Sequence, residues 1–112
     1  MAPDQPAGDR AFSVLTEPHG DALVVRASGE VDVASARSLE REIRSALDIN
    51  AEAVLLDLRD VSFIDSTGLG VLLAVATASS ANGNRLRITR LSAPVQRAID
   101  VSGLADAFPL VN

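Results

Sequence analysis

Hydrophobic residues near the start of the chain fall into two short clusters separated by a turn. Apolar and β-branched residues gather over 12–17 and again over 22–28. Between the clusters lies the run Pro18-His19-Gly20-Asp21, whose residues favour turns. Two strand-like runs on either side of such a turn usually pair with each other. The pattern therefore predicts a β-hairpin.

The stretch from about 35 to 48 has a helical period instead. Apolar residues recur every three or four positions, and most positions between them are polar or charged. The apolar positions are Ala36, Leu39, Ile43, Ala46 and Leu47, and the charged ones are Arg37, Glu40, Arg41 and Arg44. A helix with this pattern buries one face and exposes the other. We therefore expect an amphipathic helix here.

Hydrophobicity is almost continuous through the middle of the chain. Residues 53–58 form a short aliphatic run between polar neighbours, which is typical of a strand covered on both faces. A second apolar run keeps a helical period from Leu69 to Ala76 and ends at Asn82-Gly83, a common helix stop. This second run predicts a deeply buried helix.

In the last part of the chain, charged and apolar residues again alternate. Residues 85–91 alternate charged and apolar side chains, as a half-buried strand does. Ser92 and Pro94 mark the start of a helix that ends at Gly103, and residues 108–111 are expected to add a last short strand. The order of elements predicts an α/β fold, with a mixed sheet, an N-terminal hairpin and crossover helices.

The length of 112 residues fits one domain. Residues 1–11 have the composition of a disordered tail, which leaves 12–112 as the domain. No apolar run reaches the roughly 20 residues that a membrane-spanning helix needs. Because the chain has no cysteine, disulfides and Cys-type zinc sites are excluded, and a cytoplasmic location is expected.

The net charge of −5 argues against nucleic acids as partners. With three phenylalanines and no tryptophan or tyrosine, the chain lacks the basic groove and aromatic platforms that bind nucleic acids. All ten basic residues are arginine, so no lysine is available for acid–base or Schiff-base chemistry. Direct binding of DNA or RNA is therefore not expected.

The most unusual segment, residues 60–70, places polar residues and glycines between the aliphatic strand and the apolar helix. Asp65 or Ser66 is suited to cap that helix, because a side-chain oxygen there binds free backbone N–H groups. Gly68 and Gly70 each cost a helix about 1 kcal/mol relative to alanine, which indicates that a smooth surface is needed. Because a helix N-terminus also stabilises negative charge, the Ser66 hydroxyl is a candidate phosphate carrier.

The sequence lacks residues that several classes of enzyme need for catalysis. Ile64 stands where a Gly-x-Ser-x-Gly nucleophile elbow has its first glycine, and the single histidine, His19, is expected in a turn. That histidine alone makes no transition-metal site, and no Gly-Lys-Ser/Thr loop is present to bind nucleotide phosphates. A small hydrolase or phosphotransfer enzyme is kept as the rival of a different class.

Three aspartates, Asp57, Asp60 and Asp65, resemble the acidic set of a response-regulator receiver, which accepts phosphate on aspartate with bound magnesium. Receivers use an invariant lysine, however, and this chain has none. Asp57 is more simply a polar residue at the end of a strand. Asp32 is by itself no more than a turn or cap residue.

Three motifs taken together resemble those of the bacterial anti-sigma-factor antagonists built on the STAS fold. They are Gly29-Glu30-Val31-Asp32, Asp65-Ser66-Thr67-Gly68-Leu69-Gly70 and Ile99-Asp100-Val101-Ser102-Gly103-Leu104. The resemblance extends from about residue 12 to residue 111, and the central motif behind an aliphatic strand is the most specific. It implies a STAS-like fold and a binding protein without catalytic residues, metal or cofactor of its own.

The resemblance also implies a phosphorylation switch at Ser66. In this family, the serine after the motif aspartate is phosphorylated by a partner that is both anti-sigma factor and serine kinase. The unphosphorylated form binds this partner and frees a sigma factor, while phosphorylation ends the binding. A metal-dependent serine/threonine phosphatase acts on the phosphorylated form, and ATP and magnesium are held by the kinase.

Further site residues follow from matching the motif. Asp32, Asp65 and Thr67 correspond to positions beside the phosphosite. The expected partner-binding residues are Gly68, Leu69 and Gly70, because small residues let another protein approach closely.

The sequence departs from the family pattern at one point, and one alternative function stays open. Family members usually continue into a C-terminal helix, and because the sequence stops at Asn112 we expect this helix to be absent or trimmed. This is expected to affect packing over one side of the sheet, and oligomeric state, more than the phosphosite. The alternative is a STAS subunit that docks constitutively in a larger assembly without phosphate cycling, although an intact Ser66 favours the switch.

Overall fold

The computed structural model describes residues 11–83 and 85–111, so the predicted disordered tail lies outside the described residues except for Ala11. The elements from the hairpin to the third helix follow the predicted order. They are β1 (Ser13–His19), β2 (Ala22–Val31), α1 (Val33–Asp48), β3 (Ala53–Ile64), α2 (Ser66–Ala81), β4 (Leu86–Leu91), α3 (Ala93–Ser102) and the 3-10 turn η2 (Ala105–Ala107). The α/β class with an N-terminal hairpin is confirmed.

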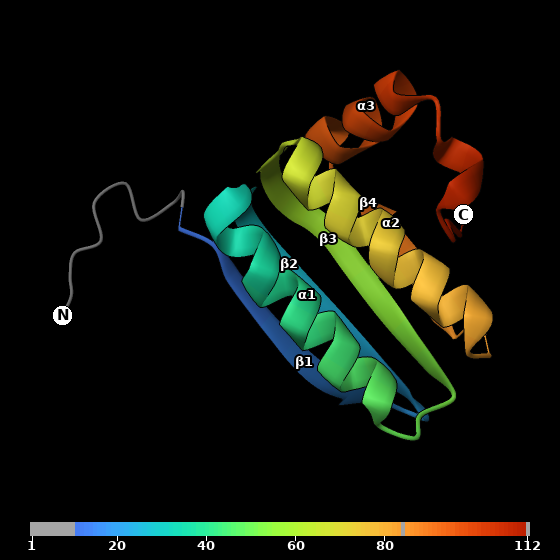
Figure 1. Cartoon of the computed structure of the whole chain (residues 1–112). Coiled ribbons are helices and arrows are strands. Elements are labelled where there is room, and N and C mark those ends of the chain that lie inside the picture. The colour runs from blue at the N-terminus through green and yellow to red at the C-terminus, as the bar shows by residue number, and fades with distance from the viewer. Residues whose placement is uncertain (1–10, 84, 112) are drawn as a thin grey trace, which may run out of the picture.

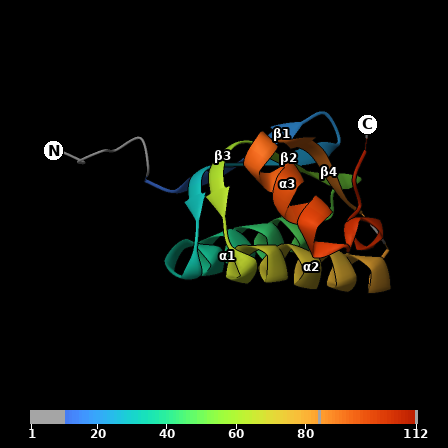
Figure 2. The same ribbon diagram turned by 90° about the horizontal axis from the view of Figure 1, so that it is seen from above.

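A single mixed sheet orders these strands as β1-β2-β3-β4. β1 and β2 form the antiparallel hairpin, while β3 is parallel to β2 and β4 is parallel to β3. Parallel neighbours need crossover connections, which α1 and α2 provide. Both helices lie side by side over the same face of the sheet (Figure 1 and Figure 2).

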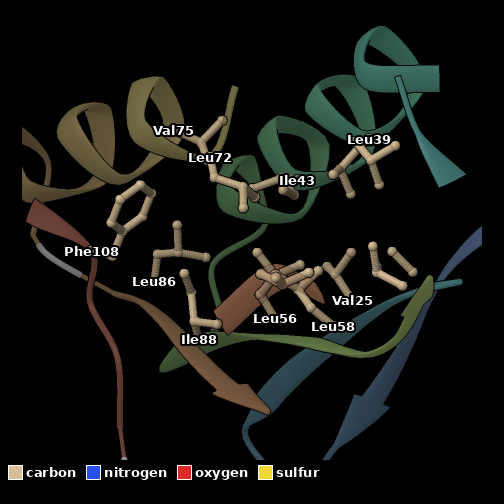
Figure 3. Packing of buried hydrophobic residues seen from close by; sticks show 14 of the residues in the cluster. Val25, Leu39, Ile43, Leu56, Leu58, Leu72, Val75, Leu86, Ile88 and Phe108 are labelled. Atoms are coloured by element: carbon tan, nitrogen blue, oxygen red, sulfur yellow. The ribbon is translucent and has the colours of Figure 1, made fainter. Parts of the chain in front are cut away.

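The hydrophobic core lies between the sheet and these two helices. Figure 3 labels its principal side chains, which are Val25, Leu39, Ile43, Leu56, Leu58, Leu72, Val75, Leu86, Ile88 and Phe108. α3 adds the fully buried Val95 and Ile99 and packs against β3. Burying one such aliphatic side chain contributes roughly 1.5–3 kcal/mol. A core of this kind holds the chain together without disulfides.

β2 and β3 are longer than the sequence predicted. The prediction ended them at residues 28 and 58, where glycine and charged residues interrupt the hydrophobic pattern. Pairing in fact continues to Val31 and Ile64, with two shifts of register along the way. The charged residues are tolerated because Arg59 and Asp60 are exposed. Residues 60–64 are therefore strand, and the first helix begins at Val33 rather than at residue 35.

Asp57 lies inside β3 and not at a strand end, so that prediction is wrong. Its carboxylate is buried and has Arg26 Nε at 3.6 Å and Arg59 Nε at 3.4 Å. The backbone N–H of Arg59 also donates to its Oδ1 at 3.1 Å. Two cations and one hydrogen bond compensate the burial of this charge, which would otherwise be costly.

The third helix and the chain end follow the prediction in part. Ser92 accepts a hydrogen bond from the N–H of Val95 at 3.4 Å, and Gly103 ends α3 at a φ of 74°. The predicted strand over residues 108–111 is wrong, because it is reduced to an isolated parallel bridge between Leu110 and Ile88. Backbone pairing along this edge is too short to count as a strand.

The second helix is less buried than its composition indicated. α2 buries Leu72, Val75 and Ala76, but Ala74 and Thr77 on its other side are exposed. An almost wholly apolar helix such as α2 can leave one side open to solvent, because the small side chains on that side expose little apolar surface. Among the described residues, no helix combines the length and hydrophobicity needed to cross a membrane.

Candidate functional site

Two helices begin side by side at one edge of the sheet. β2 and β3 are parallel neighbours, and their last residues, Val31 and Ile64, are paired. The N–H of Asp65 donates to the carbonyl oxygen of Val31 at 3.2 Å, which ties the two strand ends together. The next residues, Asp32 and Asp65, are the N-caps of α1 and α2. Both helices start at the upper end of the sheet in Figure 1.

Asp32 caps α1 through a reciprocal arrangement with Ser35. Its Oδ1 accepts the N–H groups of Ala34 and Ser35, each at 3.0 Å. In return, the Ser35 hydroxyl oxygen accepts the N–H of Asp32 at 2.9 Å. The hydrogen bond from the Ser35 backbone is the main cause that lowers the pKa of Asp32 below its usual 3.8. Asp32 therefore keeps its negative charge at this edge.

Asp65 caps α2, which decides between the two cap candidates in the sequence. Its Oδ1 accepts the N–H of Gly68 at 2.9 Å, and its carbonyl oxygen accepts the N–H of Leu69 at 2.9 Å. Ser66 is consequently the first residue of the helix and is exposed. Asp65 supplies the cap, so the Ser66 hydroxyl is not needed for it. Among the described residues, this hydroxyl has no hydrogen-bond partner.

The start of α2 offers an accessible hydroxyl in a favourable field. Thr67 is exposed beside Ser66 and presents a second hydroxyl. The N–H groups of a helix's first turn lack intrahelical acceptors, and the helix dipole adds partial positive charge there. An anionic group attached to Ser66 would be stabilised by both effects. The predicted roles of Ser66, Thr67, Asp32 and Asp65 in a phosphosite stay predictions.

Gly68 does not belong to an exposed docking surface, which corrects the sequence interpretation. Gly68 is buried, and a Cβ atom there would lie 2.6 Å from Val31 Cγ1 and 2.8 Å from Ile64 Cγ1. Its lack of a side chain serves packing within the fold. Gly70 is exposed, and a Cβ atom there would meet nothing within 4 Å. Leu69 is partly buried against the core.

Two exposed apolar residues beside the site were missed by the sequence analysis. Val33, the first residue of α1, is 66% exposed, and Phe63, near the end of β3, is 45% exposed. Phe63 pairs with Glu30 across β2 and β3. Their only signal in the sequence is their position, because Val33 follows Asp32 and Phe63 lies two residues before Asp65. The exposure of an apolar side chain depends on tertiary structure.

Comparison with known proteins identifies the family. Residues 13–112 match the STAS domain family. An anti-sigma F factor antagonist from Paenibacillus polymyxa is 32% identical over 90% of this chain and 87% of its own length. The chain belongs to the STAS family of anti-sigma-factor antagonists. The resemblance seen in the three motifs is therefore confirmed.

Solved structures share the fold of this STAS domain. The crystal structure of an anti-sigma factor antagonist from Mycobacterium paratuberculosis has a TM-score of 0.77 and 30% identity, over 90% of this chain and 86% of that chain. The Bacillus cell fate determinant SpoIIAA in its phosphorylated form has a TM-score of 0.64 and 22% identity, over 91% of this chain and 92% of that chain. The latter likeness concerns the fold alone.

Proposed function

We propose that this STAS domain is an anti-sigma-factor antagonist controlled by phosphorylation of Ser66. The unphosphorylated form binds an anti-sigma factor that is also a serine kinase, and thereby frees a sigma factor. Phosphorylation of Ser66 by that kinase ends the binding. The domain acts as a binding module and not as an enzyme.

The observation that carries the proposal is the free hydroxyl of Ser66. It is exposed at the first position of α2, while Asp65 supplies the cap that a serine could otherwise provide. A kinase can therefore reach the hydroxyl without breaking a hydrogen bond that supports the fold. Relatives named as antagonists of anti-sigma factors F and B supply the kind of partner.

Phosphorylation should leave the fold intact. A phosphate adds a charge of about −1.5 to −2 at pH 7, and the N-terminus of α2 offsets part of it. Because Ser66 is exposed, the added group needs no space in the core. The unphosphorylated and the phosphorylated forms of SpoIIAA both share the fold of this chain, which supports this expectation.

The same charge should oppose binding to the partner. Asp65 adjoins Ser66, and Asp32 caps the neighbouring helix, so the edge already carries carboxylates. In a complex, the phosphate dianion would lose water while lying close to these negative charges. Burying a charge without a matched partner costs several kcal/mol. A loss of about 3 kcal/mol would weaken binding roughly a hundredfold or more.

The docking surface would surround Ser66. It consists of Gly70 and Leu69 on α2 together with the exposed apolar side chain of Val33 at the start of α1. A few residues near the centre of an interface carry most of its binding energy. Gly68 contributes only indirectly, since it is buried.

The remaining components of the cycle would come from partners. ATP and magnesium are expected on the kinase, and a serine/threonine phosphatase would remove the phosphate. We place the cycle in the cytoplasm, where sigma factors meet RNA polymerase. No direct contact with nucleic acid or membrane is part of the proposal.

Mass spectrometry and calorimetry test the switch. A Ser66→Ala bait would first identify the partner in extracts of the native cell, and the partner would then be purified. Incubating the wild-type chain with this kinase and ATP should place one phosphate on Ser66. Titration calorimetry should then give at least a hundredfold weaker binding for the phosphorylated form than for the unphosphorylated form.

Three variants serve as controls. Thr67→Ala should still accept phosphate, whereas Ser66→Ala should bind the partner and accept none. Ser66→Asp should bind poorly with little change in melting temperature. Equal affinity of the two forms, or phosphate at another residue, would refute the switch and favour the constitutive docking subunit.

A further inference from the structure

Gly68 lies where the first turn of α2 touches the end of β2. A Cβ atom at this position would lie 2.6 Å from Val31 Cγ1, 2.8 Å from Ile64 Cγ1 and 3.2 Å from the carbonyl oxygen of Val31. Carbon atoms in contact normally stay about 3.5–4.0 Å apart. The missing side chain therefore allows the helix to sit this close to the sheet.

Val31 holds the same turn through a hydrogen bond. Its carbonyl oxygen accepts the N–H of Asp65 at 3.2 Å, and Asp65 in turn accepts the N–H of Gly68 at 2.9 Å. Asp32, the residue after Val31, caps α1. The position of Ser66 relative to the start of α1 is thus set through contacts with Val31.

We propose that Gly68 is a positioning residue that seats Ser66 beside the N-terminus of α1, so that a partner meets both helix starts as one surface. The kinetic consequence rests on the proposed function, whereas the geometric consequence does not. To reach an ordinary contact distance, an alanine methyl would have to push the first turn outward by roughly 1 Å. A misplacement of this size can cost about a hundredfold in the rate of a reaction.

The geometric test compares Gly68→Ala with Gly70→Ala. Both variants replace a glycine near the start of α2 and gain the same helix propensity. A Cβ atom at Gly70, however, meets nothing within 4 Å. Crystal structures should show a wider separation of the Ser66 and Asp32 Cα atoms in Gly68→Ala and an unchanged separation in Gly70→Ala. An unchanged separation in both would overturn the proposal.

The kinetic test measures phosphorylation of Ser66 by the purified kinase and ATP. In Gly68→Ala, kcat/KM should fall about ten- to hundredfold. Val75→Ala is the stability control, because Val75 is fully buried in the same helix but lies away from its first turn. Its kcat/KM should equal that of the wild type. Equal losses in the two variants would show a merely structural effect and refute positioning.

A rescue variant keeps the test decisive if Gly68→Ala does not fold. Val31→Ala removes the nearer of the two colliding carbons, and the half-buried Ile64 can turn toward solvent. The double variant Val31→Ala/Gly68→Ala should recover most of the wild-type kcat/KM, and a folded double variant that recovers none would contradict positioning. If the wild-type chain accepts no phosphate at Ser66, the proposed function fails, and the crystal structures alone decide the role of Gly68.

Discussion

α1 and α2 begin alike and differ in what they present to solvent. Both have 16 residues, follow a parallel strand and are capped by an aspartate. α1 exposes several charged residues, among them Arg37 and Arg41. α2 contains no charged residue, and its exposed positions include Gly70, Ala74 and Thr77. The same start is thus followed by two very different outer faces.

The difference between the two outer faces determines how readily each helix can be covered by another protein. The charged outer face of α1 is well solvated, so covering it with another protein would remove water from many ions. The outer face of α2 has little polar surface to desolvate and small side chains that permit close approach. A partner that docks beside Ser66 therefore has a lower desolvation cost along α2 than along α1.

The largest expected effect tests whether the inner sides of the two helices are equivalent. Leu39 of α1 and Leu72 of α2 are both buried in the core. Replacing either by alanine should lower the free energy of unfolding by about 2–5 kcal/mol, because each leaves a cavity. Urea denaturation of the two variants measures this. A loss below about 1 kcal/mol for Leu72→Ala alone would mean that α2 packs less closely than the structure shows.

A charge introduced on the outer face of α2 should weaken partner binding, whereas the same change on α1 should not. Gly70→Arg on α2 should weaken partner binding tenfold or more, which corresponds to about 1.4 kcal/mol. Ser45→Arg is the matched change on the exposed side of α1 and should leave affinity unchanged. Neither variant should lower the free energy of unfolding by more than about 0.5 kcal/mol, and Gly70→Arg should gain some stability because it replaces a helical glycine. Unchanged affinity of Gly70→Arg in a calorimetric titration would remove α2 from the interface.

Removal of the cap of α2 should have a moderate effect on stability. Asp65→Ala loses the acceptor for the N–H of Gly68 and should lower the free energy of unfolding by about 1 kcal/mol. Asp65→Asn keeps a side-chain oxygen and should lose less. Chemical denaturation of both variants at pH 7 makes the comparison. Equal losses would indicate that the charge of Asp65 matters more than its hydrogen bond.

The smallest expected effect concerns the pH dependence of the α1 cap. The pKa of Asp32 is lowered in the folded state, chiefly by the backbone N–H of Ser35 and then by its hydroxyl. The stabilisation is therefore complete above the ordinary pKa of 3.8 and is lost as the pH falls through the lower folded value.

A titration of Asp32 followed by NMR measures this shift. Ser35→Ala removes the hydroxyl contribution but keeps the backbone one, so the pKa of Asp32 should rise part of the way toward 3.8. Stability below about pH 4 should decline from a higher pH in this variant than in the wild type. An Asp32 pKa that does not change in Ser35→Ala would show that the hydroxyl does not stabilise the Asp32 carboxylate.

Much of this protein could be predicted from the sequence alone. The order of the elements as far as α3, the amphipathic character of α1 and the stop at Gly103 could all be predicted, because periodicity and capping depend on residues only a few positions apart. The motif around Ser66 placed the candidate site at a helix start for the same reason. Its resemblance to the STAS antagonists was confirmed by the comparisons.

Only the tertiary structure decided the features that depend on distant residues. The role of Gly68 lies in its contact with Val31, and the environment of Asp57 depends on Arg26 in the neighbouring strand. The true ends of β2 and β3 likewise follow from their mutual pairing. α2 has no charged residues that could indicate which side faces solvent, so its exposed face became visible only with its neighbours in place. Steric contacts and strand pairing join residues that lie far apart in the chain, and local patterns do not contain that information.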